Sequence, residues 1–426
     1  MPRVAPVTAV VHNERAIDGK SSYNVRFDLG NDIKFNFPGP TGPIGVDNAT
    51  SDLLDIALSV LFVERDLRKL ALTNRVSSID INIPVRQVRD WVPRSSTLRE
   101  LLCFMGGHDW HISFTKSTMP PHSADSRLEA SRKTVVLHSG GMDSASGLGS
   151  LITKARDVQL VSFYTSQRPI QEQIASELGF GQPSQMYAAW RHKKKRRGRS
   201  AFAYRSFLFL SLATLVARSF GVSRVLQFEN GFMAASVPPC PNYFVTRHAH
   251  PKYHRLFNDL LGQMSLSITV ENPFRWKTKR QAVLDFRRIV GEAKATHLLA
   301  LTQSCWFYSY HQFHSRFKRE RIEKTPHQHC GACVPCLVRR AAFRDRDYSL
   351  DPRKPPRYIQ DKRNVSYNYD AYEAFCRLVL ANRRAPEALR RALLEDGIVL
   401  DPEAGPWELL HPLLVQFSQE FLEAFE

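Results

Sequence analysis

The chain has 426 residues, of which 43% are hydrophobic, so it is long and apolar enough for two or three folded domains and is not wholly disordered. Its seven cysteines are too few and too clustered for a disulfide scaffold. The formal net charge of +18 predicts an anionic partner, such as ATP, a nucleic acid or an acidic protein. The sequence shows neither a signal-peptide pattern nor an apolar run of about 18 residues, and we therefore expect a cytoplasmic protein that does not bind membranes.

Residues 1–125 are expected to form a separate α+β domain with no catalytic residues of its own. Alternating apolar residues predict four strands, and apolar residues at helical spacing predict one long helix that Ser51 caps. The predicted elements are strands Val7–Val11, Tyr23–Leu29, Ile33–Phe37 and Ile79–Val85 and the helix Ser51–Leu70. A polar linker, Pro120–Arg132, follows this domain.

The next segment predicts a phosphate-binding loop. An apolar run, Thr134–Leu137, indicates a buried strand, and Ala145–Leu151 indicates the start of a helix. The loop between them consists of Ser139, Gly140, Gly141, Met142, Asp143 and Ser144. A helix N-terminus offers unpaired N–H groups and a partial positive charge, and glycines let an anion approach the backbone. The loop has no lysine and therefore differs from the Walker type.

A βαβ rhythm continues beyond this loop and predicts a doubly wound parallel sheet with helices on both faces. Val158–Tyr164 and Val222–Phe228 are its next predicted strands. Glu229 and Asn230 directly follow the later strand, where such sheets bind ligands, and we assign them to substrate binding. Lys193–Arg199 is a dense basic run, which is either a solvated loop or a clamp for triphosphate, nucleic acid or an acidic partner.

Four cysteines predict a metal site. Cys330, Cys333 and Cys336 have two-residue gaps that let one loop wrap a tetrahedral ion, and Cys305 is the best fourth ligand. Structural Zn²⁺ is the leading interpretation, and an iron–sulfur cluster is the main competitor. His327 and His329 remain alternatives to one thiolate.

The two motifs together resemble a known family. The glycine loop resembles the pyrophosphate loop of the PP-loop ATPases, which attack ATP at its α-phosphate. With the distal motif Ser304-Cys305 followed by Cys330–Phe343, the chain is similar to QueC, the 7-cyano-7-deazaguanine synthase of queuosine biosynthesis. The additional N- and C-terminal regions, and the total length, resemble QatC, the QueC-like component of the Qat anti-phage defence system.

The resemblance implies roles for individual residues. In the superfamily the end of the second strand contacts adenine, which implies Phe163 and Tyr164 as nucleotide contacts. Arg205 matches an arginine of QueC at a helix start, and Lys279 matches a lysine in a Thr-Lys segment that reaches a phosphate. Together with the loop, the implied catalytic residues are Asp143, Ser144 and Arg205.

The same resemblance implies an activity. QueC uses ATP and Mg²⁺ to adenylate the carboxylate of 7-carboxy-7-deazaguanine, and ammonia then displaces AMP. We expect such an ATP-dependent ligase in residues 132–345, with an acceptor that is either ammonia or an amine on a protein partner. A tRNA-modifying PP-loop enzyme and a non-catalytic nucleotide-binding scaffold remain open alternatives. Residues 346–426 are expected to form a helical extension.

Overall fold

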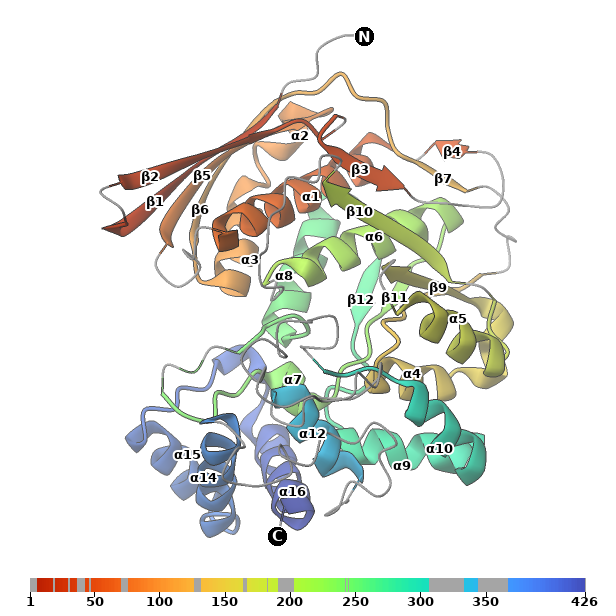
Figure 1. Cartoon of the computed structure of the whole chain (residues 1–426), viewed down its shortest axis with the longest axis vertical. Helices are drawn as coiled ribbons and strands as arrows, with labels where there is room; N and C mark the ends of the chain where they lie inside the picture. Colours follow the sequence, from red (N-terminus) through yellow and green to blue (C-terminus); the bar gives the residue numbers. More distant parts are fainter. Residues whose placement is uncertain are drawn as a thin grey trace, which may run out of the picture.

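The structure is a computed structural model of the whole chain (Figure 1). It describes residues 6–17, 20–29, 31–36, 43–45, 47–69, 76–125, 132–163, 167–181, 183–190, 203–241, 243, 245–305, 333–343 and 367–425. Within these ranges, no helix combines the length and the apolar character needed to cross a membrane.

A six-stranded sheet lies at the centre of the fold. Its strands, listed along the chain, are β3 (Ile33–Asn36), β8 (Thr134–Leu137), β9 (Val158–Phe163), β10 (Ser184–Trp190), β11 (Arg224–Leu226) and β12 (Thr269–Glu271). They are arranged in the order β12-β11-β8-β9-β10-β3. The strands from β12 to β10 pair in parallel, and β3 adds an antiparallel strand at the β10 edge. The predicted α/β fold with a parallel sheet is confirmed.

Helices cover both faces of this sheet. They are α4 (Met142–Gly149), α5 (Arg168–Glu177), α6 (Arg205–Phe220), α8 (Pro251–Gln263), α9 (Lys279–Val290) and α10 (Glu292–Leu301). Alternate strand residues face opposite cores because strand side chains have a period of two. Val135 and Val225 join a first core with α6 and α8, whereas Val136 and Leu226 join a second core with α4, α5, α9 and α10.

This arrangement fixes where a ligand would bind. The helices that follow β8 and β9 lie on the second core's face, and those that follow β10 and β11 lie on the first core's face. The winding therefore reverses between the neighbouring strands β8 and β11. In open parallel sheets, ligands bind at the carboxyl ends of the strands where this reversal occurs.

The N-terminal region forms a second sheet, and its helices α1 and α3 pack against α6 and α8. Its order is β2-β1-β5-β6, and its elements are β1 (Val7–Ile17), β2 (Lys20–Phe27), α1 (Asn48–Lys69), β5 (Val76–Val85), α2 (Val88–Trp91), α3 (Ser95–Gly106) and β6 (Asp109–Lys116). The first core continues from β1 and α1 into α6 and α8, so the expected boundary near residue 125 does not separate two cores. A small sheet pairs β4 (Pro43–Gly45) with β7 (Ser123–Asp125).

Two predicted helix starts differ from the structure. α1 begins at Asn48 because Asp47, and not Ser51, caps it: the Asp47 carboxylate accepts from the backbone N–H and hydroxyl of Thr50 at 2.8 and 2.9 Å. Ser51 lies inside the helix, where its hydroxyl accepts from the backbone N–H of His122 at 3.0 Å. α4 begins at Met142 rather than at Ala145 because Gly141 is its N-cap.

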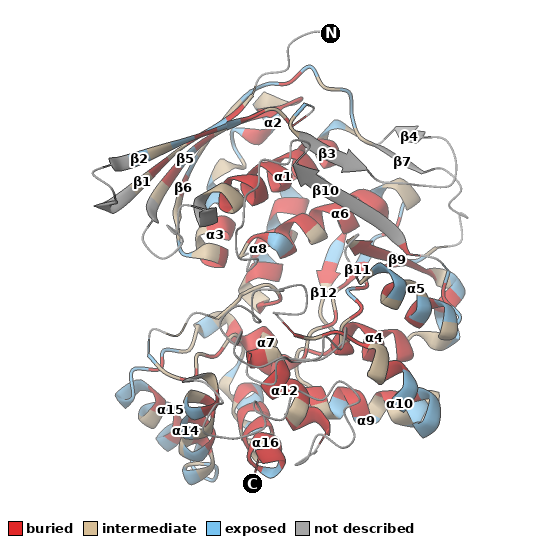
Figure 2. Ribbon diagram, viewed as in Figure 1, coloured by how far each residue is buried: buried red, intermediate tan, exposed pale blue. Residues whose placement is uncertain are grey.

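A further group of helices packs beside α9. They are α7 (Gly231–Ala235), α12 (Val334–Phe343), α14 (Tyr367–Ala381), α15 (Pro386–Glu395) and α16 (Trp407–Phe425). Their apolar side chains form a third core, and α14, α15 and α16 lie within the range 346–426 where a helical extension is expected. Figure 2 shows the buried residues concentrated along α4, α6, α12 and α16, where these layers meet.

Candidate active site

The loop between β8 and α4 is held in one conformation by its neighbours. Gly140 has a φ of +77°, a left-handed conformation that favours glycine. The Gly140 carbonyl accepts from the backbone N–H of Gln303 at 3.0 Å. The Gln171 amide donates to the Ser139 carbonyl at 3.2 Å, and the Ser144 hydroxyl donates to the Gly141 carbonyl at 2.9 Å. These bonds come from three different segments and fix the loop.

The N-terminus of α4 is arranged to accept an anion. Gly141 is its N-cap, and no side chain caps it with a hydrogen bond. The first intrahelical bond joins the N–H of Ala145 to the Gly141 carbonyl at 3.0 Å, so the N–H groups of the preceding helical residues have no partner within the helix. These donors and the helix dipole suit a phosphate group.

Four side chains meet beside this loop, at the point where the sheet reverses. The Lys279 ammonium donates to Oδ2 of Asp143 at 2.5 Å, and Nδ2 of Asn230 donates to the same oxygen at 3.1 Å. Asn230 also donates to Oε1 of Glu229 at 2.9 Å. Asp143 comes from α4, Glu229 and Asn230 follow β11, and Lys279 begins α9. The structure thus brings together four predicted site residues that are 136 positions apart at most.

Burial sets the charge balance of this cluster. It raises the pKa of the Asp143 carboxyl, with Lys279 opposing the rise and the charge of Glu229 adding to it. Burial also acts to raise the pKa of Glu229, but the hydrogen bond from His248 and the charges of His248 and Lys279 outweigh it and hold that pKa low. Glu229 is therefore the ionised member of the pair, and Asp143 is the carboxyl whose charge depends on its surroundings.

His248 is a member of this cluster that the sequence analysis missed. Its Nε2 lies 2.7 Å from Oε2 of Glu229, and its Nδ1 lies 3.1 Å from the Thr246 hydroxyl. The Asn272 side chain holds Glu229 as well: its Oδ1 accepts from the Glu229 N–H at 3.2 Å, and its Nδ2 donates to the Glu229 carbonyl at 2.8 Å. A histidine 19 residues beyond Glu229 carries no local signal of this contact.

Lys279 is a buried residue and does not lie on the surface. It is 7% exposed and follows Thr278, whose hydroxyl and Gln281 form a capping box at the start of α9. The Thr278 hydroxyl donates to Glu420 of α16 at 2.8 Å. A cation in the first turn of a helix opposes the helix dipole, and the ion pair with Asp143 compensates for that cost.

Phe163 and Arg205 both lie near Phe209 of α6. The Phe163 ring is 5.3 Å from the Phe209 ring, and the guanidinium carbon of Arg205 lies 5.5 Å from the centre of the Phe209 ring. Phe163 is half-buried at the end of β9, and Arg205 is exposed at the start of α6. In the described part of the chain no hydrogen bond joins Arg205 to Asp143. Tyr164 lies outside the described residues, as does the basic run Lys193–Arg199.

Three of the four predicted metal-binding cysteines lie together. The Sγ atoms of Cys305, Cys333 and Cys336 are all within 4.8 Å of one another, and all three residues are buried. Thiolates at this spacing are the donors that tetrahedral Zn²⁺ and iron–sulfur clusters take, so the set fits a metal. Cys330, His327 and His329 lie outside the described residues.

The cysteine cluster is connected to the phosphate loop. Gln303, whose N–H bonds Gly140, is two residues before Cys305. Arg339 of α12 is 1% exposed and donates to the Thr302 hydroxyl at 2.7 Å and to the Leu299 carbonyl at 3.0 Å. A metal held at the cysteines would therefore also fix the segment that supports the loop.

The residues present fit a nucleotide with a divalent cation. Asp143 Oδ1 is buried and has no hydrogen-bond partner among the described atoms. Such a carboxylate oxygen suits Mg²⁺, which binds one or two carboxylates together with substrate phosphates. A Cβ on Gly141 would lie 3.1 Å from the Ser139 hydroxyl and 3.4 Å from the Gln303 carbonyl, so a side chain at this position would crowd the loop.

The comparison with protein families agrees with this site. Residues 184–347 match the family model described as queuosine biosynthesis protein QueC. The match includes Glu229, Asn230, Lys279 and the four cysteines and begins beyond the phosphate loop. The chain therefore contains a QueC-like domain. No curated protein matches the chain.

Proposed function

We propose that this chain is an ATP-dependent enzyme of the 7-cyano-7-deazaguanine synthase type. It adenylates the carboxylate of 7-carboxy-7-deazaguanine, or of a related acid, and transfers the acyl group to ammonia or to an amine on a protein. The observation that supports this most is the Asp143–Lys279–Glu229 cluster beside the uncapped start of α4. The match to QueC supports the substrate class.

The site suits leaving-group activation. A carboxylate oxygen attacks the α-phosphorus of ATP, a P–O bond breaks, and pyrophosphate leaves. The backbone N–H groups at the start of α4 and the Lys279 ammonium stabilise the charge that develops on pyrophosphate. Mg²⁺ bound at Asp143 would neutralise part of that charge. An amine then attacks the acyl carbon, and the C–O bond to AMP breaks.

The test measures AMP and pyrophosphate release with ATP, Mg²⁺ and 7-carboxy-7-deazaguanine. Asp143→Ala should lower the carboxylate-dependent rate by about 100-fold or more, because it removes the cation ligand and leaves Lys279 buried without its partner. Asp396→Ala, at an exposed helix end, is the matched control and should keep the wild-type rate. If the wild-type protein releases no AMP with any such acid, the proposal is wrong and the scaffold alternative is favoured.

Two finer proposals concern the context. The regions outside residues 184–347 support a QatC-like role in anti-phage defence, with protein partners. The net charge of +18 favours the alternative of a tRNA-modifying enzyme. Pyrophosphate release that RNA stimulates, and that added salt suppresses, would support that alternative.

A further inference from the structure

The C-terminal helix α16 lies against two of the segments that carry the polar cluster of the candidate active site. Leu413, Phe417 and Glu420 recur at helical spacing, so they share one face of this helix. All three are buried. The face they form packs on α7, which follows Asn230, and on the start of α9, which carries Lys279.

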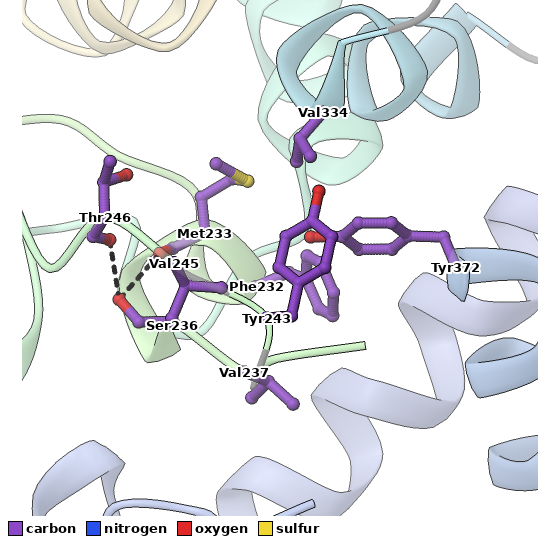
Figure 3. Close-up of a pocket in the computed structure, with 9 residues that line it drawn as sticks. All are labelled: Phe232, Met233, Ser236, Val237, Tyr243, Val245, Thr246, Val334 and Tyr372. Carbon is purple, nitrogen blue, oxygen red and sulfur yellow. Dashed lines mark hydrogen bonds between the residues drawn. The ribbon is translucent and has the colours of Figure 1, made fainter. Parts of the chain in front are cut away.

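The apolar part of this face is held by α7. The rings of Phe417 and Phe232 are stacked, with their centres 3.5 Å apart and their planes at 10°. Figure 3 shows Phe232 beside Tyr243 and Tyr372, and the Phe232 and Tyr372 ring centres are 5.9 Å apart. Close packing among these rings fixes the position of α16 relative to α7. Glu420 lies about one helical turn beyond Phe417, so this packing fixes its place as well.

Glu420 is a buried acid that is bonded to the start of α9. It is 2% exposed, and its Oε1 accepts from the Thr278 hydroxyl at 2.8 Å and from the Gln416 amide at 2.9 Å. Burial raises the pKa of this carboxyl, although the hydrogen bonds from Gln416 and Thr278 and the charge of Arg280 oppose the rise. A carboxyl group offers an acceptor oxygen in either protonation state, so the bond to Thr278 does not depend on the charge.

The Thr278 hydroxyl connects Glu420 to Lys279. It has one proton and two lone pairs, and donating the proton to Glu420 leaves a lone pair for the backbone N–H of Gln281 at 3.2 Å. The Gln281 side chain accepts in turn from the Thr278 N–H at 2.9 Å, which completes the capping box. Lys279 is the next residue, and its ammonium donates to Asp143. The backbone from which this ammonium extends is therefore held by α16.

The residue after Lys279 adds to the same contact. Arg280 Nη2 donates to the Glu420 carbonyl at 2.8 Å, and Nη1 forms an ion pair with Glu423 at 2.6 Å. Its Nε donates to the Ala341 carbonyl of α12 at 2.9 Å. The start of α9 is thus joined to α16 and α12 as well as to the phosphate loop.

We propose that Glu420 is a positioning residue, through which α16 holds Lys279 where it binds the pyrophosphate part of ATP. The proposal rests on the role of Lys279 in the function proposed above. Glu420 lies outside residues 184–347, so the QueC-like domain takes one support of its site from the C-terminal helices. Without the Glu420 acceptor, the Thr278 hydroxyl loses its partner and the first turn of α9 loosens. The Lys279 ammonium then spends less time where it attracts phosphate.

Binding of inorganic pyrophosphate with Mg²⁺ tests the proposal without requiring catalysis. Isothermal titration calorimetry on the full chain compares Glu420→Leu, which removes the acceptor, with Glu420→Gln, which keeps one. Glu420→Leu should raise the Kd about fivefold or more, and Glu420→Gln should restore it to within about twofold of the wild type. Glu408→Leu, at an exposed position of the same helix, is the matched control and should keep the wild-type Kd. A wild-type Kd in Glu420→Leu, or no binding to the wild type, would overturn the proposal.

A double-mutant cycle separates positioning from a general loss of stability. Lys279→Met keeps the apolar stem and removes the charge, and in this background Glu420→Leu should weaken pyrophosphate binding no further. An equal loss of affinity in both backgrounds would show that Glu420 does not act through Lys279. Thr278→Val and Thr278→Ser test the same bond from the other side. The first should match Glu420→Leu and the second the wild type, and a wild-type Kd in Thr278→Val would also overturn the proposal.

Exchange of labelled pyrophosphate into ATP with 7-carboxy-7-deazaguanine distinguishes this proposal from the proposed function. If the wild type binds pyrophosphate but shows no exchange with any such acid, the function is rejected, and the calorimetric cycle still decides whether Glu420 positions Lys279. If exchange occurs, Glu420→Leu should raise the KM for pyrophosphate about fivefold or more. An unchanged KM would contradict the role given to Glu420.

Discussion

At the scale of single residues, the site is defined by where charges are buried. Asp143, Glu229 and Lys279 place two carboxyls and one cation in contact, and His248 adds a hydrogen bond from the other side. One cation does not balance two ionised carboxylates in a poorly solvated site. A divalent cation bound at Asp143 would stabilise the ionised form of its carboxyl. Such a cation would also give the buried Oδ1, which has no hydrogen-bond partner among the described atoms, a ligand.

His138, which directly precedes the phosphate loop, gives a pH prediction. Burial lowers its pKa from 6.5 to about 4, although Nε2 bonds the Gln171 carbonyl at 3.0 Å. Between these two values the unfolded chain binds a proton that the folded chain does not. The free energy of unfolding should therefore be fully retained above pH 6.5 and fall as the pH drops toward 4, by up to about 1.4 kcal/mol per pH unit.

Urea unfolding between pH 4 and pH 7 measures this effect. His138→Gln keeps a donor toward Gln171 and does not titrate. Its free energy of unfolding should therefore change less steeply with pH than that of the wild type, by the amount that corresponds to about one proton. The buried His250 and His254 have lowered pKa values as well and leave a residual slope in both proteins. Identical slopes would show that His138 is not held neutral in the fold.

At the scale of elements, α4 is positioned by glycines. A Cβ on Gly147 would lie 2.1 Å from the Phe228 ring, so Gly147→Ala must move either the helix or the buried Phe228 side chain. We expect it to lower the free energy of unfolding by about 1–3 kcal/mol. In α8, by contrast, no atom lies within 4 Å of a Cβ on the exposed Gly262, so Gly262→Ala should be stabilising by about 0.5–1 kcal/mol. Urea unfolding compares the pair, and equal effects would contradict this account.

The sequence predicts elements well where the signal is local. The apolar run Thr134–Leu137, the two glycines after it and the C-terminal helices all lie where expected. The α1 cap was predicted wrongly because Ser51 and Asp47 are both good cap residues, and only the packing of Ser51 against His122 decides between them. The burial of Lys279 and the role of His248 depend on contacts between segments 19 to 136 residues apart, which no local pattern records.

At the scale of the whole molecule, both terminal regions hold site residues in place. In the N-terminal region Glu64 accepts from the N–H of Ala203 at 2.7 Å, and Trp110 donates to the Tyr204 hydroxyl at 2.9 Å, immediately before Arg205. Glu420 of the C-terminal helix α16 accepts from Thr278, next to Lys279. The two terminal regions thus contact the segments that carry Arg205 and Lys279, and we expect the loss of either region to disturb the fold.

The cysteine cluster gives the last prediction, because it connects the distal end of the fold to the phosphate loop. Cys333→Ser should remove bound metal, lower the Tm and raise the KM for ATP, since the Gln303–Gly140 bond lies two residues from Cys305. Cys103→Ser, at a half-buried cysteine outside the cluster, is the control and should change none of the three. Metal analysis distinguishes zinc from iron, and visible absorbance reports an iron–sulfur cluster. A metal-free wild type with the same Tm and KM as Cys333→Ser would show that these thiols pack together without a metal and do not support the loop.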